Sequence, residues 1–376
     1  TSDGGFLLAG SSNSGIGGDK SQPSFGGHDF WVVKLRADGS KAWDRTIGGS
    51  GNDHLAKMLL TPDGGCILAG SSNSDVSGIK TSPKKGTNSS SDYWLVKLSS
   101  SGVKIWDKTF GGDAEEELTS LALTADGGYI LGGHSKSGIS ADKTEPNRGL
   151  YSTSDYWVVK TDAAGNLQWE KTLGGNQEDE MYGVAQLADG NYLAGGWSNS
   201  NIGHDRTSSG YGSASFWLVK LDTAGAKMWD HSLGGYGSDI LMDLQVTSDR
   251  GLILGGFSTS QAGGDKTTPK YGDYDTWIIK LGAGILNLKE LKPAFDLTLF
   301  PNPSHGKFQL HLTGLTASTA EVTVTDLLGR TILQQQFQTN NAQLSEEIRL
   351  PAATKGMYLL QVKAGGKITS RKIVVE

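Results

Sequence analysis

Cysteine is almost absent from this chain, because Cys66 is the single copy in 376 residues. One thiol cannot form a disulfide within the chain, so the cysteine content says nothing about the redox compartment. Cys66 stands in a short apolar run, where the matching residues of similar runs elsewhere are Phe6, Tyr129, Tyr192 and Leu252. Free cysteine is often buried, so this pattern indicates a packing residue.

Long hydrophobic runs and an excess of basic residues are also missing. No apolar run approaches the roughly 20 residues that a membrane helix needs, so we predict no transmembrane segment. The 34 Lys and Arg residues are outnumbered by 40 Asp and Glu, which gives a net charge of -6. Phosphate binding requires a basic face, so nucleic acid is excluded as the main partner. Familiar catalytic motifs such as His-Glu-x-x-His and Gly-x-Ser-x-Gly do not occur.

Glycine, in contrast, is abundant, with 54 copies, and many of them belong to an internal repeat. Each repeat opens with an Asp-Gly-Gly-type turn and a short apolar run, as at residues 3–10. An aromatic residue, Trp, two aliphatic residues and Lys follow, as at residues 30–34, and then Trp-Asp and Gly-Gly, as at residues 43–49. The repeats begin at Asp3, Asp63, Asp126, Asp189 and Asp249, so the spacing is 60 to 63 residues.

Each repeat contains four candidate strands, which predicts an all-β chain built as a β-propeller of five repeat units over residues 1–281. The first two strands occur five times, whereas the third and fourth occur four times. We therefore predict that residues upstream of this sequence complete the ring, with five blades if only one hairpin is missing. Residues 282–296 are predicted to be a linker, and residues 297–376 a small Ig-like β-sandwich.

The paired glycines are followed four residues later by an acidic residue. These residues are Asp53, Glu116, Asp179 and Asp239. A carboxylate in this place can accept hydrogen bonds from backbone N–H groups of the turn. We predict this structural role rather than metal binding. The repeated tryptophans are likewise predicted to wedge between neighbouring sheets, because their rings bury a large area.

Two sets of positions that vary between repeats are the candidate ligand sites, because repeat proteins carry function on such positions. The residue after the small pair that ends the apolar run is a large ring in three successive repeats: His134, Trp197 and Phe257. Such rings suit stacking on a sugar, although unequal packing between units explains them as well. The second set consists of aromatic residues in the long connection between the first two strands: Phe25, Tyr211 and Tyr271.

The same long connection is rich in Asn and Asp, whose oxygens are the ligands that calcium prefers. Asp19, Asp142, Asp205 and Asp265 each precede a Lys or Arg, which brings a positive charge to the loop. No EF-hand loop occurs anywhere in the sequence. We therefore predict that no cofactor is needed, with calcium as the open alternative.

The last 80 residues carry a different set of motifs. They are Phe300-Pro301-Asn302-Pro303, Gly306, the segment from Asp326 to Gly329-Arg330, Gly356 with Tyr358, and Arg371-Lys372. With these motifs in this order, the tail resembles the type A C-terminal sorting domain of proteins exported by the type IX secretion system. The preceding repeats are similar to Asp-Gly-Gly/Trp-Val-Val-Lys repeat proteins found among such cargo.

This resemblance implies partners and a location. The expected partners are the type IX translocon and its outer-membrane shuttle, which would read the tail. The expected location is the medium or the cell surface, outside a Gram-negative outer membrane. We predict that the repeats form a binding or adhesion module for a glycan or protein ligand. A polysaccharide-degrading propeller enzyme and a structural surface repeat in an assembly are the alternatives.

Overall fold

The structure is a computed structural model that describes residues 1–86, 90–149, 153–287, 296–326, 330–340, 342–351, 355–365 and 367–376. The chain divides into two compact units, Thr1–Leu288 and Lys289–Glu376. The described residues contain 25 strands and one short 3-10 helix, η1. The chain is therefore all-β, as its strand-like repeat pattern indicates.

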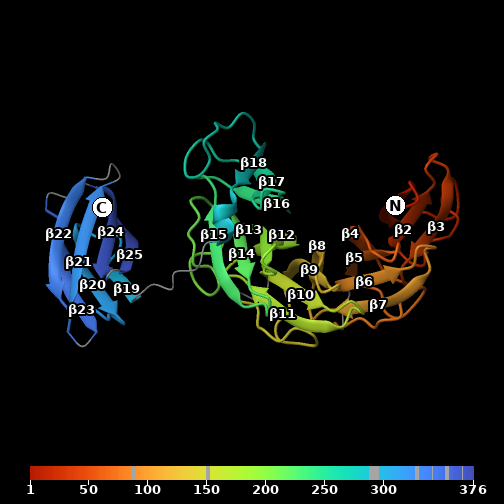
Figure 1. The fold of residues 1–376 in the computed structure, drawn as a ribbon, viewed down its shortest axis with the longest axis horizontal. Helices are drawn as coiled ribbons and strands as arrows, with labels where there is room; N and C mark the ends of the chain where they lie inside the picture. Colours follow the sequence, from red (N-terminus) through yellow and green to blue (C-terminus); the bar gives the residue numbers. More distant parts are fainter. Residues whose placement is uncertain are drawn as a thin grey trace. The chain divides into compact units, whose positions relative to one another are not determined.

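The first unit consists of five antiparallel sheets, one for each repeat, which follow one another in chain order (Figure 1). The first sheet contains β1 (Phe6–Ser12), β2 (Asp29–Leu35) and β3 (Lys41–Ile47). The second contains β4 (Asp53–Leu60), β5 (Cys66–Ser72), β6 (Asp92–Leu98) and β7 (Lys104–Phe110). The third contains β8 (Glu116–Leu123), β9 (Tyr129–Ser135), β10 (Asp155–Thr161) and β11 (Leu167–Leu173). The fourth contains β12 (Asp179–Gln186), β13 (Tyr192–Ser198), β14 (Ser215–Leu221) and β15 (Lys227–Leu233), and the fifth β16 (Asp239–Val246), β17 (Leu252–Ser258) and β18 (Asp275–Leu281).

The three middle sheets have four strands, and the two end sheets have three. One face of each end sheet has no neighbouring sheet over it among the described residues. β5 is buried along its whole length, whereas Phe6 and Leu8 of β1 are 55% and 54% exposed. At the other end, Ile278 of β18 is 67% exposed. The described residues thus form five stacked sheets, and they do not form a closed ring.

Aromatic side chains join each sheet to the next. The strands β2, β6, β10, β14 and β18 are equivalent in the five repeats. Between each two neighbouring sheets, an aromatic residue near the start of one of these strands packs against the Trp of the next. The pairs are Phe30–Trp94, Tyr93–Trp157, Tyr156–Trp217 and Phe216–Trp277, with ring centroids 4.8–5.0 Å apart. Three of these tryptophans are completely buried. The predicted wedging role of the repeated tryptophans is confirmed for these positions.

The Asp or Glu that follows the Trp of β3, β7, β11 or β15 accepts a hydrogen bond from the Trp of the preceding strand. The indole Nε1 of Trp94 donates to Asp107 at 3.0 Å, and that of Trp157 donates to Glu170 at 2.7 Å. The same Asp107 carboxylate accepts the backbone N–H groups of Thr81 and Ser82. A buried indole needs a hydrogen-bond acceptor, and the acid one strand away supplies it. The acid therefore ties the long connection to its own sheet.

The helix η1 (Ala283–Asn287) lies within the segment predicted as a linker. Leu286 is buried in the same apolar cluster as Trp229, and its carbonyl accepts the Lys220 ammonium at 2.6 Å. This part of the segment therefore belongs to the first unit, because Leu286 is buried in an apolar cluster whose other members all lie in that unit. Residues 288–295 lie outside the described residues.

The second unit consists of two antiparallel sheets around one core. One sheet contains β19 (Asp296–Phe300), β20 (Lys307–Thr313) and β23 (Gln343–Arg349). The other contains β22 (Thr331–Gln338), β21 (Thr319–Asp326), β24 (Gly356–Ala364) and β25 (Lys367–Val375). Both sheets contribute to the core, for example through Phe308 and Leu310 on one side and Val322 and Leu360 on the other. The alternating apolar residues of these strands explain the arrangement, because one face of each sheet must be buried.

Candidate functional site

The predicted ligand positions His134 and Trp197 lie in adjacent sheets, near the ends of β9 and β13. Within each sheet an acidic residue stands directly opposite on the neighbouring strand. His134 pairs in register with Glu117 of β8, and Trp197 pairs with Glu180 of β12. In each of the two sheets an aromatic ring therefore lies opposite a carboxylate.

Tyr182 links the two sheets, and the sequence reasoning missed it. The pairing of β12 with β13 shifts register between Met181 and Gly183, so Tyr182 is the extra residue of a β-bulge. A bulge changes the direction of a side chain, and the Tyr182 ring here lies 6.4 Å from the His134 ring. The repeat sequence gave no sign of this role, because the register of the strands is set only in the folded sheet.

The polar side chains around His134 and Tyr182 contact one another, and some of them are exposed to solvent. His134 Nε2 lies 3.6 Å from Glu117 Oε2, and this contact lowers the pKa of Glu117. The Tyr182 hydroxyl donates to Glu180 Oε2 at 2.9 Å, and burial raises the pKa of Tyr182. His134 is buried, whereas the Glu117 side chain is 61% exposed. We call Glu117, His134, Glu180, Tyr182 and Trp197 the ring-and-carboxylate cluster.

The other predicted ligand residues do not join this cluster. Phe257 of β17 lies 5.7 Å from Tyr274, in the last sheet. Phe25 and Tyr211 sit over glycines of the next repeat, because a Cβ built on Gly78 would come within 2.9 Å of Phe25. In the same way, Gly264 lies under Tyr211. These contacts explain both rings by packing between neighbouring loops.

Tyr271 is the exception among the loop aromatics, because it is 87% exposed. It lies in the connection between β17 and β18 of the last sheet, as Phe25 lies in the connection between β1 and β2 of the first sheet. No described residue packs a ring against it. Its assignment as a ligand residue stays a prediction.

The acidic residues after the Gly-Gly pairs have the predicted turn role. Asp53 Oδ2 accepts the Gly49 N–H at 2.7 Å, and Asp179 Oδ2 accepts the Gly175 N–H at 2.8 Å. Glu116 and Asp239 make the corresponding bonds. The prediction of a carboxylate-capped turn is therefore confirmed.

A second buried carboxyl group lies beside three of these turns. The pairs are Asp29 with Asp53, Asp92 with Glu116, and Asp155 with Asp179, and all six residues are 0% exposed. Burial raises the pKa of Asp155 to about 7 and of Asp179 to about 6, and it also raises the pKa values of Asp92 and Glu116. Two carboxyl groups that face each other without water resist losing both protons. These groups are completely buried between neighbouring sheets, out of reach of a ligand on the surface.

The long connections are organised by buried cations of the chain itself. The Lys20 ammonium donates to the Ser14 carbonyl and the Ser24 hydroxyl, both at 2.8 Å. Lys80 occupies the same place in the second repeat, where burial lowers its pKa to about 8. Among the described residues, no group of three or more His, Cys, Asp or Glu side chains is arranged to hold a metal ion. The prediction that no cofactor is needed stays a prediction.

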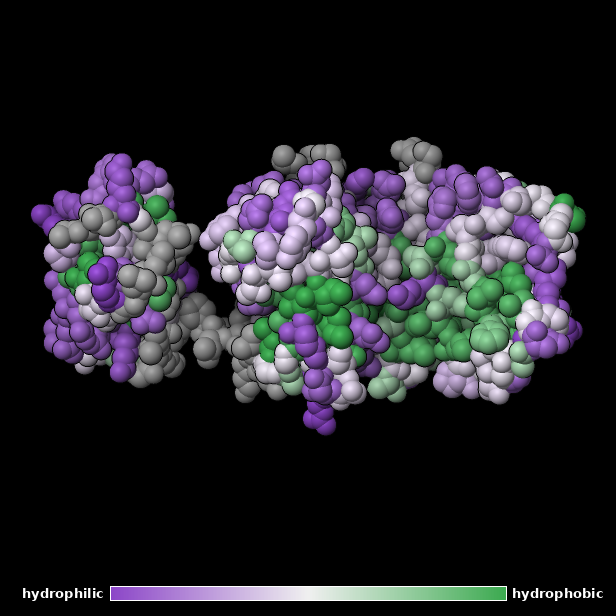
Figure 2. All heavy atoms as spheres, turned by 90° about the horizontal axis from the view of Figure 1, so that it is seen from above, coloured by the Kyte–Doolittle hydropathy of each residue, from purple (hydrophilic) through white to green (hydrophobic). Residues whose placement is uncertain are grey.

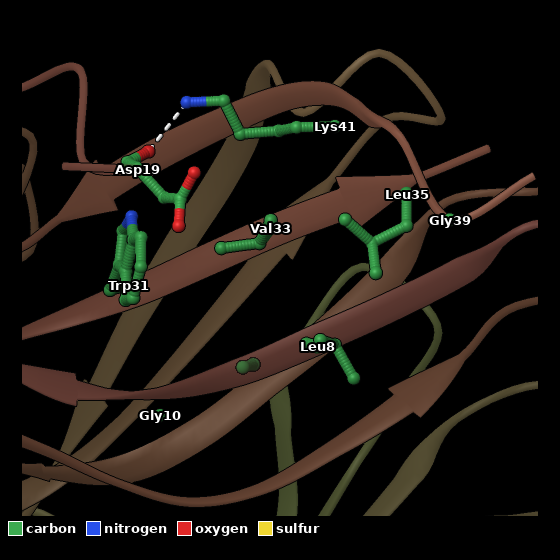
Figure 3. A pocket seen from close by; sticks show the side chains of 9 residues that line it. Leu8, Gly10, Asp19, Trp31, Val33, Leu35, Gly39 and Lys41 are labelled. Carbon is green, nitrogen blue, oxygen red and sulfur yellow. Dashed lines mark hydrogen bonds between the residues drawn. The ribbon is translucent and has the colours of Figure 1, made fainter.

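A pocket of about 520 Å³ lies away from the cluster, on the exposed face of the first sheet. Figure 3 shows Leu8, Trp31, Val33 and Leu35 along its wall, with Lys41 and Asp19 at the rim. Figure 2 shows green areas at the right, at this end of the first unit, and a further green area near the middle of the view. The pocket is thus an uncovered part of a sheet face.

The motifs at the two ends of the tail meet in space. Asn302 Oδ1 accepts the backbone N–H of Val374 at 2.8 Å, and the Ser304 N–H donates to the Val374 carbonyl at 2.9 Å. The Phe300-Pro301-Asn302-Pro303 segment therefore lies beside the last strand, β25, which contains Arg371. Phe300 and Arg371 are exposed.

The remaining tail motifs stabilise turns and the core. Arg330 donates to both oxygens of Asp326, at 2.9 Å from its backbone N–H and 2.7 Å from Nε. Tyr358 is buried, and Gly306 and Gly356 adopt positive φ angles. Gly329 lies outside the described residues, and the Lys372 side chain is not described.

Comparison with known proteins supports this assignment of the tail. Residues 298–376 match the family model of the secretion system C-terminal sorting domain. The tail is therefore handled as a sorting signal of the type IX secretion machinery, and it indicates export to the medium or the cell surface. No helix among the described residues has the length and apolar character required to cross a membrane.

The repeats have weaker matches. Regulatory protein FlaEY of Caulobacter vibrioides is 26% identical over 235 residues, which cover 60% of this chain and 24% of that protein. The chain thus spans about a quarter of the length of this curated relative.

Three solved structures give low similarity. Sqt1 from Chaetomium thermophilum has a TM-score of 0.30 at 13% identity, covering 87% of this chain and 73% of its own. The tail fiber of Staphylococcus aureus phage P68 has a TM-score of 0.26 at 10% identity, covering 100% and 89%. Dimeric latent PorU from Porphyromonas gingivalis has a TM-score of 0.21 at 9% identity, covering 98% and 34%. These scores are too low to bear on the fold.

Proposed function

We propose that the first unit is a β-propeller-type binding or adhesion module that works outside the Gram-negative outer membrane. The ring-and-carboxylate cluster is its ligand site, and the tail delivers it there through the type IX translocon and outer-membrane shuttle. The observation that carries the proposal is the partly buried Trp197, which lies opposite Glu180, while Tyr182 of the same sheet reaches His134 and its partner Glu117 in the neighbouring sheet.

Glycan is the ligand class that this chemistry favours. An aromatic ring presents an apolar face to the C–H groups of a sugar, and carboxylates beside it accept hydrogen bonds from sugar hydroxyls. The contact with His134 lowers the pKa of Glu117 below its ordinary acidic value, so Glu117 is an ionised hydrogen-bond acceptor at neutral pH. A protein ligand is the second candidate, because exposed Trp and Tyr side chains also serve as anchors in protein interfaces.

The distribution of raised carboxyl pKa values favours binding over hydrolysis. A glycosidase needs a carboxylic acid that stays protonated beside the sugar. The carboxyl groups with raised pKa values, such as Asp155 and Glu116, are completely buried between sheets. Glu117, which faces the cluster, has a lowered pKa instead.

The test is a glycan array probed with the full chain, followed by titration of any sugar that binds. We expect Trp197→Ala to weaken binding at least tenfold and Trp197→Phe to restore most of it, because phenylalanine keeps a stacking face. Phe257→Ala is the matched control, because it removes a half-buried ring outside the cluster. Binding that survives Trp197→Ala, or the absence of any sugar ligand, would reject the glycan site. If no sugar binds, a pull-down with the full chain tests for a protein ligand, and Tyr182→Ala is the control that should lose it.

Export is tested separately, so that its outcome does not depend on the ligand. Deleting residues 296–376 is expected to leave the first unit in the periplasm of a host with a type IX system. Fusing the same residues to an unrelated periplasmic protein is expected to export it. Normal secretion of the truncated chain would contradict the sorting role.

A further inference from the structure

Two histidines lie side by side where the first sheet meets the second, and their imidazole rings contact each other. His28 stands directly before β2, and His54 is the second residue of β4. Their ring centroids are 5.1 Å apart, with the ring planes tilted by 33°. The backbone N–H of Asp53 donates to the His28 carbonyl at 2.6 Å, and this bond holds the two histidines together.

The repeat itself does not require the ring of His28. The same position is taken by Ser91, Ser154 and Ala214 in the next three repeats, where the corresponding backbone bond also forms. A small side chain is therefore sufficient for the structure of this junction. Repeat proteins carry binding function on positions that differ between their units, so the histidine pair is a candidate contact site.

The nitrogens of both imidazoles are available to a ligand. Neither ring makes a hydrogen bond to any residue that the structure describes. His54 is exposed, and His28 is partly buried. A neutral imidazole carries one donor and one acceptor, and a sugar hydroxyl offers the complementary pair. Two such rings side by side can therefore bond neighbouring hydroxyl groups of one sugar unit.

His54 belongs to a row of residues that continues into the ring-and-carboxylate cluster. It is the second residue of β4, as Glu117 is of β8 and Glu180 is of β12. These three strands contact one another, and they follow the inner side of the arc of sheets in Figure 1. His134 and Trp197 lie opposite Glu117 and Glu180 on the neighbouring strands. The histidine pair and the cluster therefore occupy equivalent places in successive sheets.

Contacts across the interfaces connect the members of this row. The pKa of Glu117 is lowered by its contact with His134 and, to a smaller extent, by a positive charge on His54 of the preceding sheet. The His134 ring in turn lies 6.4 Å from the Tyr182 ring of the following sheet. The row therefore runs from His28 at the first sheet to Trp197 in the fourth.

The row ends beyond Trp197. Ile240 stands at the corresponding position of β16, directly opposite Phe257. Phe257 packs against Tyr274 of its own sheet. An isoleucine side chain offers no hydrogen bond to a sugar, so the row extends from the cluster toward the first sheet alone.

We propose that the row from Trp197 to His28 binds a linear polysaccharide along its length, and that His28 and His54 form an additional subsite for a further sugar unit. This extension rests on the proposed glycan function of the cluster. Face-to-face sheets lie roughly 10 Å apart, so a row across successive sheets is longer than one sugar ring. The polysaccharide is therefore recognised over several units rather than by one terminal sugar.

The test is isothermal titration calorimetry of the full chain with oligosaccharides of two to six units. The probes are size series of β-1,4-linked glucose, mannose, galactose and N-acetylglucosamine. In the series that binds, we expect the longest oligomer to bind about tenfold more tightly than the dimer, because two added hydrogen bonds contribute about this factor. His28→Ser should remove this gain and leave the affinity for the dimer unchanged. Serine is the residue that two other repeats carry at this position, so the variant should fold.

Three further variants separate the subsite from the cluster. His54→Ala is expected to act as His28→Ser does, because it removes the other ring of the pair. Trp197→Ala should weaken the binding of every oligomer, the dimer included. Phe257→Ala should change neither the affinity for the dimer nor the gain with length, because Phe257 lies beyond the end of the row. Circular dichroism checks that each variant is folded.

Two outcomes would overturn the extension. One is an affinity of the wild type that does not rise with the length of the oligomer. The other is a rise that both His28→Ser and His54→Ala leave intact. Either outcome, combined with a loss of binding in Trp197→Ala, would leave the glycan function of the cluster standing. The absence of binding to every series would reject both.

Discussion

Replacing Asp155 by asparagine isolates the effect of a buried carboxyl pair on stability. Asp155 is completely buried next to Asp179, and one of its oxygens accepts the backbone N–H of Arg148. Its other oxygen has no hydrogen-bond partner among the described residues and lies against Gly174, where a Cβ would come within 2.0 Å. Asparagine keeps the shape and the acceptor but cannot ionise.

The size of the effect follows from the pKa of Asp155, which burial raises from 3.8 to about 7. A raised folded-state pKa means that the folded protein holds its proton more tightly than the unfolded chain does. The stabilisation is therefore fully present below pH 3.8 and is lost as the pH rises through about 7. Between pH 5 and pH 8 the free energy of unfolding falls by roughly 2–3 kcal/mol from this group. Asp155→Asn should remove that decline.

The assay is urea unfolding followed by tryptophan fluorescence at pH 5, 6, 7 and 8. All ten tryptophans lie in the first unit, so the signal reports this unit alone. The control is Asp162→Asn, which removes the same charge from an exposed turn where the pKa is lowered, so it has no effect in this pH range. If the free energy of unfolding fell as steeply from pH 5 to pH 8 in Asp155→Asn as in the wild type, the raised pKa of Asp155 would be refuted.

Three further predictions concern the repeats. Gly165→Ala should destabilise the first unit by roughly 2–3 kcal/mol in urea unfolding, because the new Cβ would collide with Trp106. Gly39 also has a positive φ but no such neighbour, so Gly39→Ala should cost only about 1 kcal/mol, and equal costs would count against the contact of Gly165 with Trp106. Arg250→Gly should raise the free energy of unfolding by about 1 kcal/mol, because Arg250 adopts φ 62° where four repeats have glycine, and an unchanged or lower value would contradict the strain. Cys66 should resist iodoacetamide at pH 8 until urea unfolds the unit, since burial raises its pKa to about 11, and rapid labelling of the native chain, read by mass spectrometry, would contradict its burial.

Much of the fold could be predicted from local pattern alone. The 60- to 63-residue period, the glycines at turns and the alternation of strands and hairpins gave the sheet of each repeat, because these signals act within a few residues of one another. The carboxylate turn at Asp53 was predictable for the same reason. The tail motifs also led to the sorting domain, although the contact of Asn302 with the last strand spans 72 residues and was not visible in the sequence.

The candidate site was only half predictable. His134 and Trp197 stood out because they break the repeat, but Phe25 and Tyr211 broke it equally and turned out to cover glycines of neighbouring loops. Tyr182 gave no signal, because a bulge in strand pairing turns its side chain toward His134. Composition and spacing do not encode such a shift in register.

The sequence by itself determined what each repeat is made of and what kind of signal the tail carries. Both depend on residues close together in the chain, where turn chemistry and strand periodicity act directly. Only the tertiary structure decided which residues meet between sheets: the carboxyl pair of Asp155 and Asp179, the ring-and-carboxylate cluster, and the contact of Trp106 with Gly165. These arise from stacking sheets whose contacting residues are about 60 positions apart, and the stacking geometry has no local signature.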